Sequence, residues 1–217
     1  MSRKNERLIM ETFPLWQLSR LRMGTDGHGV TDLVCSFGCP LNCKYCINPL
    51  SHCENGKYTN VTPEQLVNMV KLDSLYFEAT GGGIMFGGGE PLLHAKFIAK
   101  FREIEAKSWR NYCETSLYVS SECVKVASTC IDGFYVDIKD TNPEIFKKYT
   151  GVDGIDKVMD NLTLLLSLVG PDRITVRVPR IPGYNAENNI QDSLQKLKSI
   201  GITNFDVFNY RIKRSKE

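Results

Sequence analysis

The sequence predicts an α/β fold, specifically a partial (β/α)6 barrel of parallel strands. Runs rich in β-branched or aromatic residues alternate with amphipathic helical patterns from residue 30 to the end, as in repeated βαβ units. With 217 residues, 42% of them hydrophobic, the chain can bury one substantial core. We therefore expect a single domain over residues 1–217, in which residues 1–25 form an N-terminal extension.

Six segments have the composition of strands. In chain order they are residues 30–35, 83–86, 116–119, 134–138, 174–178 and 204–208. In a barrel of parallel strands the functional groups gather on the loops that follow the carboxyl ends of the strands. We expect the functional site at that end.

Helical periodicity fills the intervals between these strands. The first helix has its own start signal, with Thr62 as N-cap, Pro63 at the first helical position and Gln65 completing a capping box. Three sets of apolar residues recur at helical spacing and should cover the sheet: Leu93, Phe97, Phe101 and Ile104; Ile155, Val158, Leu162 and Leu165; and Ile190, Leu194, Leu197 and Ile200.

Composition narrows the range of partners and locations. A formal net charge of +2 with both signs interspersed gives no reason to expect nucleic acid or an anionic membrane surface as partner. The N-terminus lacks the long apolar core of a signal peptide, and no stretch approaches membrane-spanning length. We expect a cytoplasmic protein in which the clustered thiols among its eight cysteines bind metal or do redox chemistry rather than form disulfides.

Cys39, Cys43 and Cys46 form a C-x3-C-x2-C run on the loop after the first strand. Thiolates select zinc, cuprous copper or iron–sulfur clusters, and a structural zinc site needs a fourth protein ligand. A cubane cluster held by three cysteines leaves one iron open to a substrate or cofactor. Cys53, beside His52, is either a fourth ligand or a surface thiol. The other thiols are expected to be structural: Cys35, Cys113, Cys123 and Cys130.

A glycine turn, Gly87-Gly88-Gly89, followed by Glu90, comes after the second strand. It lets the backbone approach a ligand closely, although tight strand-to-helix turns also use glycine for steric reasons.

Charged residues mark the fourth and fifth strands. Asp137 and Lys139 lie in the run 135–139, and Arg177 lies in the next strand. Charges within an apolar strand are costly unless they are paired or bound to a ligand. The alternative to a ligand site is a structural Asp–Lys pair inside the barrel.

Together these motifs resemble the radical S-adenosylmethionine superfamily, and more narrowly the activating enzymes of glycyl radical enzymes. The cysteine run with Tyr45 before its last cysteine is similar to the superfamily signature, and the turn 87–91 is similar to its methionine-amine motif. The resemblance covers most of the chain after residue 20 and includes segments 26–31, 114–115, 135–139, 149–151 and 177–184.

The resemblance implies that Cys39, Cys43 and Cys46 hold a 4Fe-4S cluster whose open iron is chelated by S-adenosylmethionine. Tyr45 would lie near the adenine, unless it only covers the cluster. The turn would bind the methionyl amine, and no catalytic residue is expected beyond the cofactor ligands. The cofactor-binding residues implied are Tyr45, Gly87, Gly88, Gly89, Glu90, Ser116, Asp137, Lys139 and Arg177.

The family chemistry implied is reductive cleavage of the sulfonium to methionine and a 5′-deoxyadenosyl radical. In the activases this radical takes a hydrogen atom from a glycine of a partner glycyl radical enzyme, and a flavodoxin- or ferredoxin-like protein donates the electron. Asp137, with Glu114 and Thr115, matches a region that holds a monovalent cation in some relatives. The chain has no second cysteine-rich insertion, which places it nearest the single-cluster activases of the pyruvate formate-lyase or anaerobic ribonucleotide reductase type.

The candidate substrate loop, Asp26-Gly27-His28, departs from the family pattern Asp-Gly-Pro-Gly-x-Arg. His28 replaces the proline and Thr31 the arginine, and Glu114 stands where aspartate is usual. The identity of the partner therefore stays open. Two alternatives remain, a radical S-adenosylmethionine reaction on another peptide or small molecule, and a non-catalytic zinc or iron–sulfur binding module.

Overall fold

The structure, a computed structural model, describes residues 11–24 and 26–212. These residues form an eight-stranded sheet in the order β3-β1-β2-β4-β5-β6-β7-β8. The predicted α/β fold is confirmed, because six neighbouring strands run parallel in a partial barrel. Their bounds are β2 Val30–Ser36, β4 Gly83–Gly88, β5 Arg110–Thr115, β6 Gly133–Asp137, β7 Ile174–Arg180 and β8 Asn204–Asn209.

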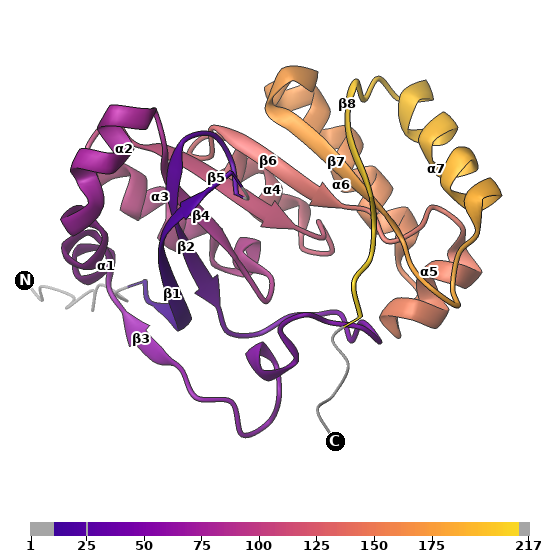
Figure 1. Ribbon diagram of the computed structural model, residues 1–217, viewed down its shortest axis with the longest axis horizontal. Coiled ribbons are helices and arrows are strands. Elements are labelled where there is room, and N and C mark those ends of the chain that lie inside the picture. Colours follow the sequence, from indigo (N-terminus) through magenta and orange to yellow (C-terminus); the bar gives the residue numbers. More distant parts are fainter. Residues whose placement is uncertain (1–10, 25, 213–217) are drawn as a thin grey trace, which may run out of the picture.

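Helices connect the parallel strands and form the outer layer (Figure 1). Among them α1, α3, α4 and α6 pack side by side in that order. The core lies between this layer and the sheet, where Phe86, Val136 and Val176 are fully buried. The helix bounds are α1 Pro63–Val70, α2 Ser74–Thr80, α3 Ala95–Ile104, α4 Ser121–Ser128, α5 Pro143–Thr150, α6 Ile155–Val169 and α7 Glu187–Ser199.

The predicted capping box starts α1. The Thr62 hydroxyl accepts the Gln65 N–H, and the Gln65 side chain accepts the Thr62 N–H at 2.8 Å. These two hydrogen bonds provide acceptors for backbone N–H groups that otherwise have no partner at the start of a helix.

The predicted helix faces are confirmed in α6 and α7. All four residues named for α6 are buried; in α7 Ile190 and Leu197 are buried, and the other two are half-buried against the core. In α3 the prediction is wrong at both ends, because Leu93 and Ile104 are 45% and 44% exposed. Leu93 lies in a 3-10 turn ahead of α3, which changes its phase, and Ile98 completes the buried face.

The third parallel strand lies earlier in the chain than predicted. Residues 116–119 are not a strand; β5 ends at Thr115. Beyond it Leu117 adopts a left-handed conformation with φ of 56°. Asn161 of α6 donates hydrogen bonds to the carbonyls of Leu117 and Val119 at 2.9 and 3.0 Å. The apolar composition of this segment therefore reflects a buried turn.

Much of the predicted N-terminal extension belongs to the sheet, which corrects that prediction. Residues 1–10 and 25 lie outside the described residues, but β1 Phe13–Met23 pairs antiparallel with β2, and β3 Thr59–Val61 pairs antiparallel with β1. Two register irregularities interrupt the pairing of β1 with β2. They break the period-two alternation that would have marked β1 as a strand.

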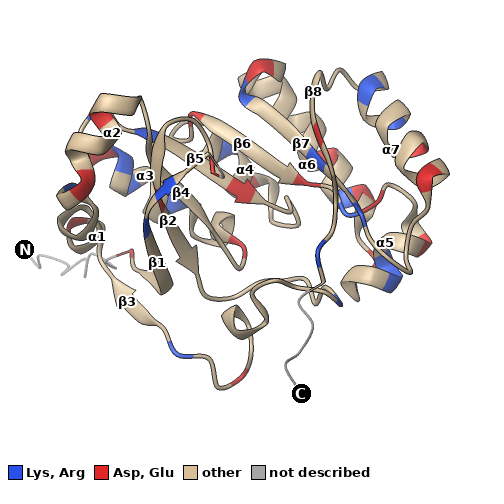
Figure 2. Ribbon diagram, in the orientation of Figure 1, with Lys and Arg blue, Asp and Glu red and all other residues tan. Residues whose placement is uncertain are grey.

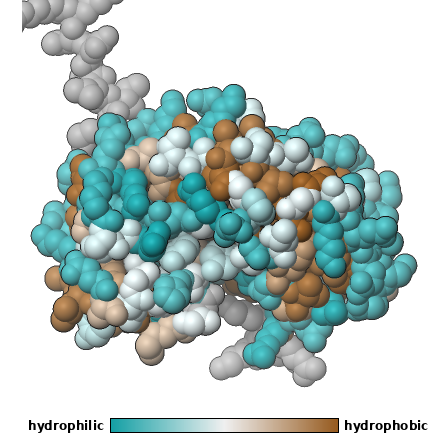
Figure 3. Space-filling model, turned by 90° about the horizontal axis from the view of Figure 1, so that it is seen from above, coloured by the Kyte–Doolittle hydropathy of each residue, from teal (hydrophilic) through white to brown (hydrophobic). Residues whose placement is uncertain are grey.

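The surface carries charges of both signs. Acidic and basic residues are interspersed along the helices (Figure 2). Seen from above, hydrophilic residues cover much of the surface, and hydrophobic ones gather in separate patches (Figure 3). Within the described ranges, no helix has both the length and the apolar composition needed to cross a membrane.

Candidate active site

The three cysteines of the loop after β2 line a cavity of about 650 Å³. This loop, residues 37–48, is called the cluster loop below. The cavity lies at the carboxyl ends of the parallel strands, as the barrel topology predicts. Other predicted residues that line it with Cys39, Cys43 and Cys46 are Gly88, Gly89, Ser116, Asp137, Lys139 and Arg177.

Backbone hydrogen bonds join the glycine turn to the start of the cluster loop. The Gly89 N–H donates to the carbonyl of Ser36 at 3.0 Å, and the Glu90 N–H donates to that of Gly38 at 2.8 Å. A Cβ on Gly89 would lie 2.0 Å from the Gly38 oxygen, and Gly88 has a φ of 95°. Glycine is required at both positions, for close approach at Gly89 and for conformation at Gly88. Gly87 lies one position earlier, within β4.

Glu90 is turned into the protein instead of the cavity, with only 1% of its surface exposed. One carboxylate oxygen accepts the Thr115 hydroxyl at 2.6 Å and the Leu92 N–H at 3.2 Å. The other accepts the N–H and the hydroxyl of Ser116 at 2.8 and 2.6 Å. Burial raises the pKa of Glu90, although the bonds from Ser116 and Thr115 oppose the rise. Glu90 thus positions the glycine turn relative to Ser116.

Charged side chains from β5 to β8 form a network beside the cavity. The Arg177 guanidinium forms an ion pair with Glu114, and its Nε lies 3.6 Å from Asp137 Oδ1 and 3.4 Å from Asp206 Oδ2. Lys139 Nζ lies 2.9 Å from the other oxygen of Asp137. Burial lowers the pKa of Lys139, but the Asp137 carboxylate outweighs it and leaves this pKa raised. The strand charges are therefore paired, and Asp137, Lys139 and Arg177 also face the cavity.

The predicted cation region already contains positive charge. Glu114 and Asp137 face Arg177, Asp137 also faces Lys139, and the Thr115 hydroxyl donates to Glu90. The cation site stays a prediction: three carboxylates, those of Glu114, Asp137 and Asp206, face the two cationic side chains Lys139 and Arg177.

The donor set of three cysteine thiols in one cavity fits an iron–sulfur cluster, because such clusters are held by thiolates. Across the described ranges, no three His, Cys, Asp or Glu side chains come together closely enough to hold one metal ion. Burial raises the pKa of Cys39 to about 12 and also raises that of Cys43. Such thiols stay protonated until iron binds them as thiolates.

The Tyr45 ring lies outside the main cavity. It packs edge-on against Tyr149 and Tyr184, with centroid distances of 6.1 and 5.6 Å, and its carbonyl accepts the Tyr210 hydroxyl. Tyr45 lines a second cavity of about 360 Å³, which is formed largely by cluster-loop residues. Both roles of Tyr45, a contact to the adenine and a cover over the cluster, stay predictions.

The candidate substrate loop Asp26-Gly27-His28 lies at the other end of β2 from the cluster loop (Figure 1). Asp26 forms an ion pair with Arg22, which is the register partner of Thr31 across the hairpin. An arginine from β1 thus stands opposite the position where the family pattern has its own. None of the three loop residues lines the cavity.

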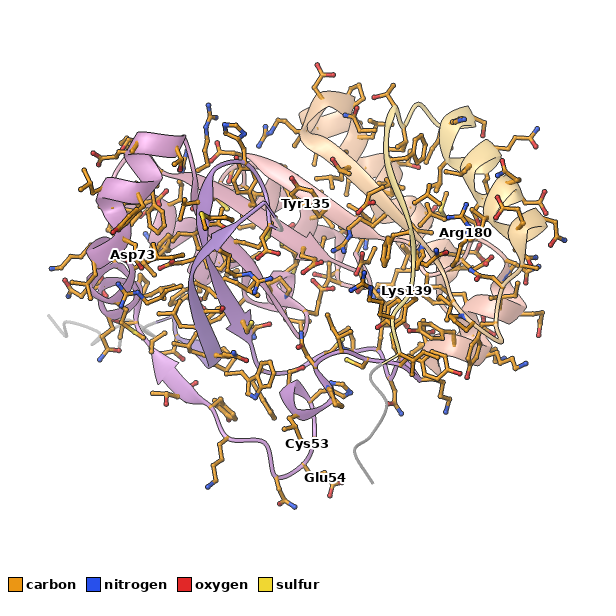
Figure 4. The ribbon with its side chains drawn as sticks, in the orientation of Figure 1. Cys53, Glu54, Asp73, Tyr135, Lys139 and Arg180 are labelled. Atoms are coloured by element: carbon orange, nitrogen blue, oxygen red, sulfur yellow. The ribbon has the colours of Figure 1, made fainter. Side chains whose placement is uncertain are left out.

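None of the remaining cysteines lines the main cavity. Figure 4 shows Cys53 in the segment between the cluster loop and β3, well away from Lys139, and Cys53 lines neither cavity. The other thiols, expected to be structural, are buried or half-buried: Cys35, Cys113, Cys123 and Cys130.

Sequence reasoning missed part of the site. Tyr149, Phe208 and Tyr210 line the cavity, and Asp206 belongs to the charge network. Asp206 carried a usable signal, since it is a charged residue within a predicted strand, like Asp137. Tyr149 was marked only as part of the resembling segment 149–151. Phe208 and Tyr210 carried no signal, because an aromatic side chain at a strand end is usually part of the core.

Comparison with known sequences agrees with this geometry. The profile of the Radical SAM superfamily matches residues 33–203. The (2S)-3-sulfopropanediol dehydratase activating enzyme of Klebsiella oxytoca is 37% identical over 58% of this chain and 39% of its own length. The 4-hydroxyphenylacetate decarboxylase activating enzyme of Clostridioides difficile is 26% identical over 85% of this chain and 78% of its own.

A third relative is the pyruvate formate-lyase-activating enzyme of Staphylococcus epidermidis, 39% identical over 47% of this chain and 40% of its own length. The match thus spans less than half of the Klebsiella and Staphylococcus relatives. Among solved structures, native anSMEcpe with bound AdoMet superposes with a TM-score of 0.62 at 23% identity, over 83% of this chain and 50% of that one. This likeness shows a shared fold.

Proposed function

The chain belongs to the radical S-adenosylmethionine superfamily, and on that premise we propose that it activates a glycyl radical enzyme. In this proposal the cavity of about 650 Å³ holds a 4Fe-4S cluster and S-adenosylmethionine. One observation carries it: the three cysteines meet the glycine turn and the charged strand ends in a single cavity. The names of the relatives, all activating enzymes, support the narrower activity.

The residues that line the cavity have different roles in the proposal. Cys39, Cys43 and Cys46 hold the cluster. The Lys139 ammonium and the Arg177 guanidinium offer charge and donors for a carboxylate, the group for which these side chains are suited. The backbone of the glycine turn binds the amine, and Ser116 contributes a hydroxyl. When bound, the two cofactors supply the electron and the 5′-deoxyadenosyl group for hydrogen abstraction.

The proposal extends to the partners and location. We infer a protein substrate with a reactive glycine, a flavodoxin- or ferredoxin-like electron donor, and a cytoplasmic location. The formal net charge of +2, with both signs interspersed, supports a site for proteins rather than for nucleic acid or a membrane surface. A monovalent cation beside Asp137 is compatible with the proposal, because Glu114, Asp137 and Asp206 carry one negative charge more than Lys139 and Arg177 balance.

Anaerobic reconstitution with iron and sulfide tests the cofactor site. We expect a brown protein that binds iron and, once reduced, converts S-adenosylmethionine to 5′-deoxyadenosine. Cys43→Ser should lose both the iron and the product. Cys53→Ser is the matched control, since this thiol belongs to a nearby segment and lines neither cavity, and it should retain both.

Electron paramagnetic resonance then tests the partner. Mixed with a glycyl radical enzyme of the kinds on which the named relatives act, the reduced protein should produce a glycyl doublet. Cleavage of S-adenosylmethionine without a doublet from any of these partners would favour a reaction on another peptide or small molecule. A colourless, zinc-containing protein purified under strict anaerobiosis would instead indicate a non-catalytic binding module.

A further inference from the structure

Tyr149, near the end of α5, places an unpaired hydroxyl group in the wall of the cavity. Its side chain is 1% exposed, yet the residue lines the cavity. Among the described residues, none meets its Oη atom at good hydrogen-bond distance and angle, although the Tyr210 hydroxyl lies close enough to interact with it. A buried hydroxyl of this kind is costly unless something bound in the site provides its partner. Neither the fold nor the proposed cofactor contacts account for it.

Backbone hydrogen bonds hold Tyr149 beside Cys43. The two residues that flank Cys43 both donate their N–H groups to the end of α5. Asn42 donates to the carbonyl of Thr150 at 2.8 Å, and Lys44 donates to the carbonyl of Tyr149 at 3.0 Å. The segment that carries the second cysteine is therefore tied directly to the residue with the unpaired hydroxyl.

Aromatic neighbours fix the direction of the ring. Tyr45, Tyr184 and Tyr210 contact the Tyr149 ring edge-on, with centroid distances of 6.1, 5.0 and 6.4 Å. A fully buried ring enclosed in this way keeps one rotamer. The hydroxyl therefore stays on the side of the cavity that it shares with Cys43.

Two acceptors interact electrostatically with the Tyr149 hydroxyl: the oxygen of Tyr210, and the sulfur of Cys43, which lines the same cavity. Tyr210 is neutral and already donates to the carbonyl of Tyr45. A cluster-bound Cys43 is a thiolate, and a hydrogen bond to an ionised acceptor is about twice as strong as one between neutral groups. The charged sulfur is therefore the stronger competitor for the Tyr149 proton.

We propose that Tyr149 donates a hydrogen bond to the Cys43 thiolate in the loaded protein and thereby raises the reduction potential of the cluster. This inference rests on the proposed cluster site. Hydrogen bonds to the ligating sulfurs are among the factors that set cluster potentials. Such a bond withdraws negative charge from the sulfur, so it stabilises the reduced, more negative cluster more than the oxidised one. Tyr149 is in this sense a positioning residue that acts through Cys43.

Tyr149→Phe removes the hydroxyl and keeps the ring. Tyr184→Phe is the matched control, because Tyr184 packs against Tyr149 but does not line the main cavity. Both variants and the wild type are loaded anaerobically, their iron content is measured, and the midpoint potential is determined by redox titration. We expect a more negative midpoint in Tyr149→Phe and the wild-type value in Tyr184→Phe.

A spectroscopic measurement checks the bond itself. In D2O the reduced wild-type cluster should show an electron–nuclear coupling to an exchangeable deuteron that Tyr149→Phe lacks. A wild-type cluster without that coupling overturns the inference, whether or not the variant folds. If Tyr149→Phe takes up no cluster while the wild type and Tyr184→Phe do, Tyr149 has a structural role and the inference is also overturned.

Two further outcomes separate the possible failures. An unchanged potential in loaded Tyr149→Phe, accompanied by a lower melting temperature, would assign the proton to Tyr210 and defeat only this inference. A wild-type protein that takes up no cluster would defeat the proposed function itself.

Discussion

Lys139 contacts both the folded strand end and the cavity. Its ammonium group lies 2.9 Å from Asp137, and its side chain is 13% exposed. The carboxylate keeps the pKa of Lys139 raised despite the burial that lowers it, so the side chain stays charged at neutral pH. A fixed ammonium group of this kind suits the carboxylate of S-adenosylmethionine.

Lys139→Gln should weaken S-adenosylmethionine binding about 10- to 100-fold, since a hydrogen bond to a charged group is worth about 1.5–3 kcal/mol. Equilibrium dialysis with the loaded protein measures the dissociation constant. Lys147→Gln is the matched control, because its ion pair with Asp153, at 3.0 Å, is exposed and neither residue lines the cavity. Equal dissociation constants in the two variants would exclude Lys139 from the binding site.

The site residues differ in how visible they are in the sequence. Asp137, Lys139 and Arg177 could be predicted because a charge in an apolar strand needs a partner or a ligand. Tyr149 was marked only as part of the resembling segment 149–151, because a tyrosine on the apolar face of a helix otherwise has the pattern of a core residue. Only the packing of α5 against the cluster loop places this residue next to the segment that carries Cys43.

Among the elements, β5 shows that a strand rich in polar residues is difficult to predict from the sequence. Asn111 is fully buried and donates hydrogen bonds to Glu105 at 3.0 Å and to the carbonyl of Cys130 at 3.4 Å. Glu114 pairs with Arg177 of β7. Each partner comes from another element, so the local composition of β5 looks too polar for a strand. The long apolar repeat of α6, in contrast, needed no tertiary information.

Asn161→Asp should destabilise the turn after β5. The native side chain is 4% exposed and donates to the carbonyls of Leu117 and Val119 at 2.9 and 3.0 Å. Aspartate has almost the same size but sets a carboxylate against both oxygens. We expect the free energy of unfolding, measured with urea, to fall by about 2–4 kcal/mol. Asp160→Asn, an exposed neighbour on α6, should change it little; an equal loss in both would exclude the turn as the cause.

At the scale of the whole molecule, the cluster loop is held by segments far apart in the chain. The glycine turn bonds to Ser36 and Gly38, the end of α5 bonds to Asn42 and Lys44, and Tyr210 beyond β8 bonds to Tyr45. Barrel topology predicted that these strand ends share one edge of the sheet. Which side chains then meet depends on the paths of the loops, which follow no short sequence rule.

Two buried aspartates, Asp32 in β2 and Asp73 between α1 and α2, link the β1–β2 hairpin to the helical layer; Figure 4 labels Asp73. Asp32 and Asp73 are 0% and 1% exposed. Arg20 donates to both oxygens of Asp73 at 2.6 Å, and the Leu21 N–H donates to Asp32 at 2.9 Å. Burial raises the pKa of Asp32 to about 7, against the hydrogen bond from Leu21, and Asp73 adds to the rise.

Asp32 should therefore make the fold less stable as the pH rises. The folded chain keeps the Asp32 proton up to pH about 7, whereas the unfolded chain releases it near pH about 4. Unfolding between these values releases a proton, so this contribution to the free energy of unfolding falls through that window and levels off above it.

Asp32→Asn cannot ionise, yet it keeps an acceptor for the Leu21 N–H. Relative to the wild type it should gain stability as the pH rises, by about 1–4 kcal/mol at pH 8 compared with pH 4. Urea unfolding at pH 4, 6 and 8 measures the difference, with Glu103→Gln, an exposed acid on α3, as control. A difference that stays constant across these pH values would mean that Asp32 is ionised in the folded chain as readily as in the unfolded one.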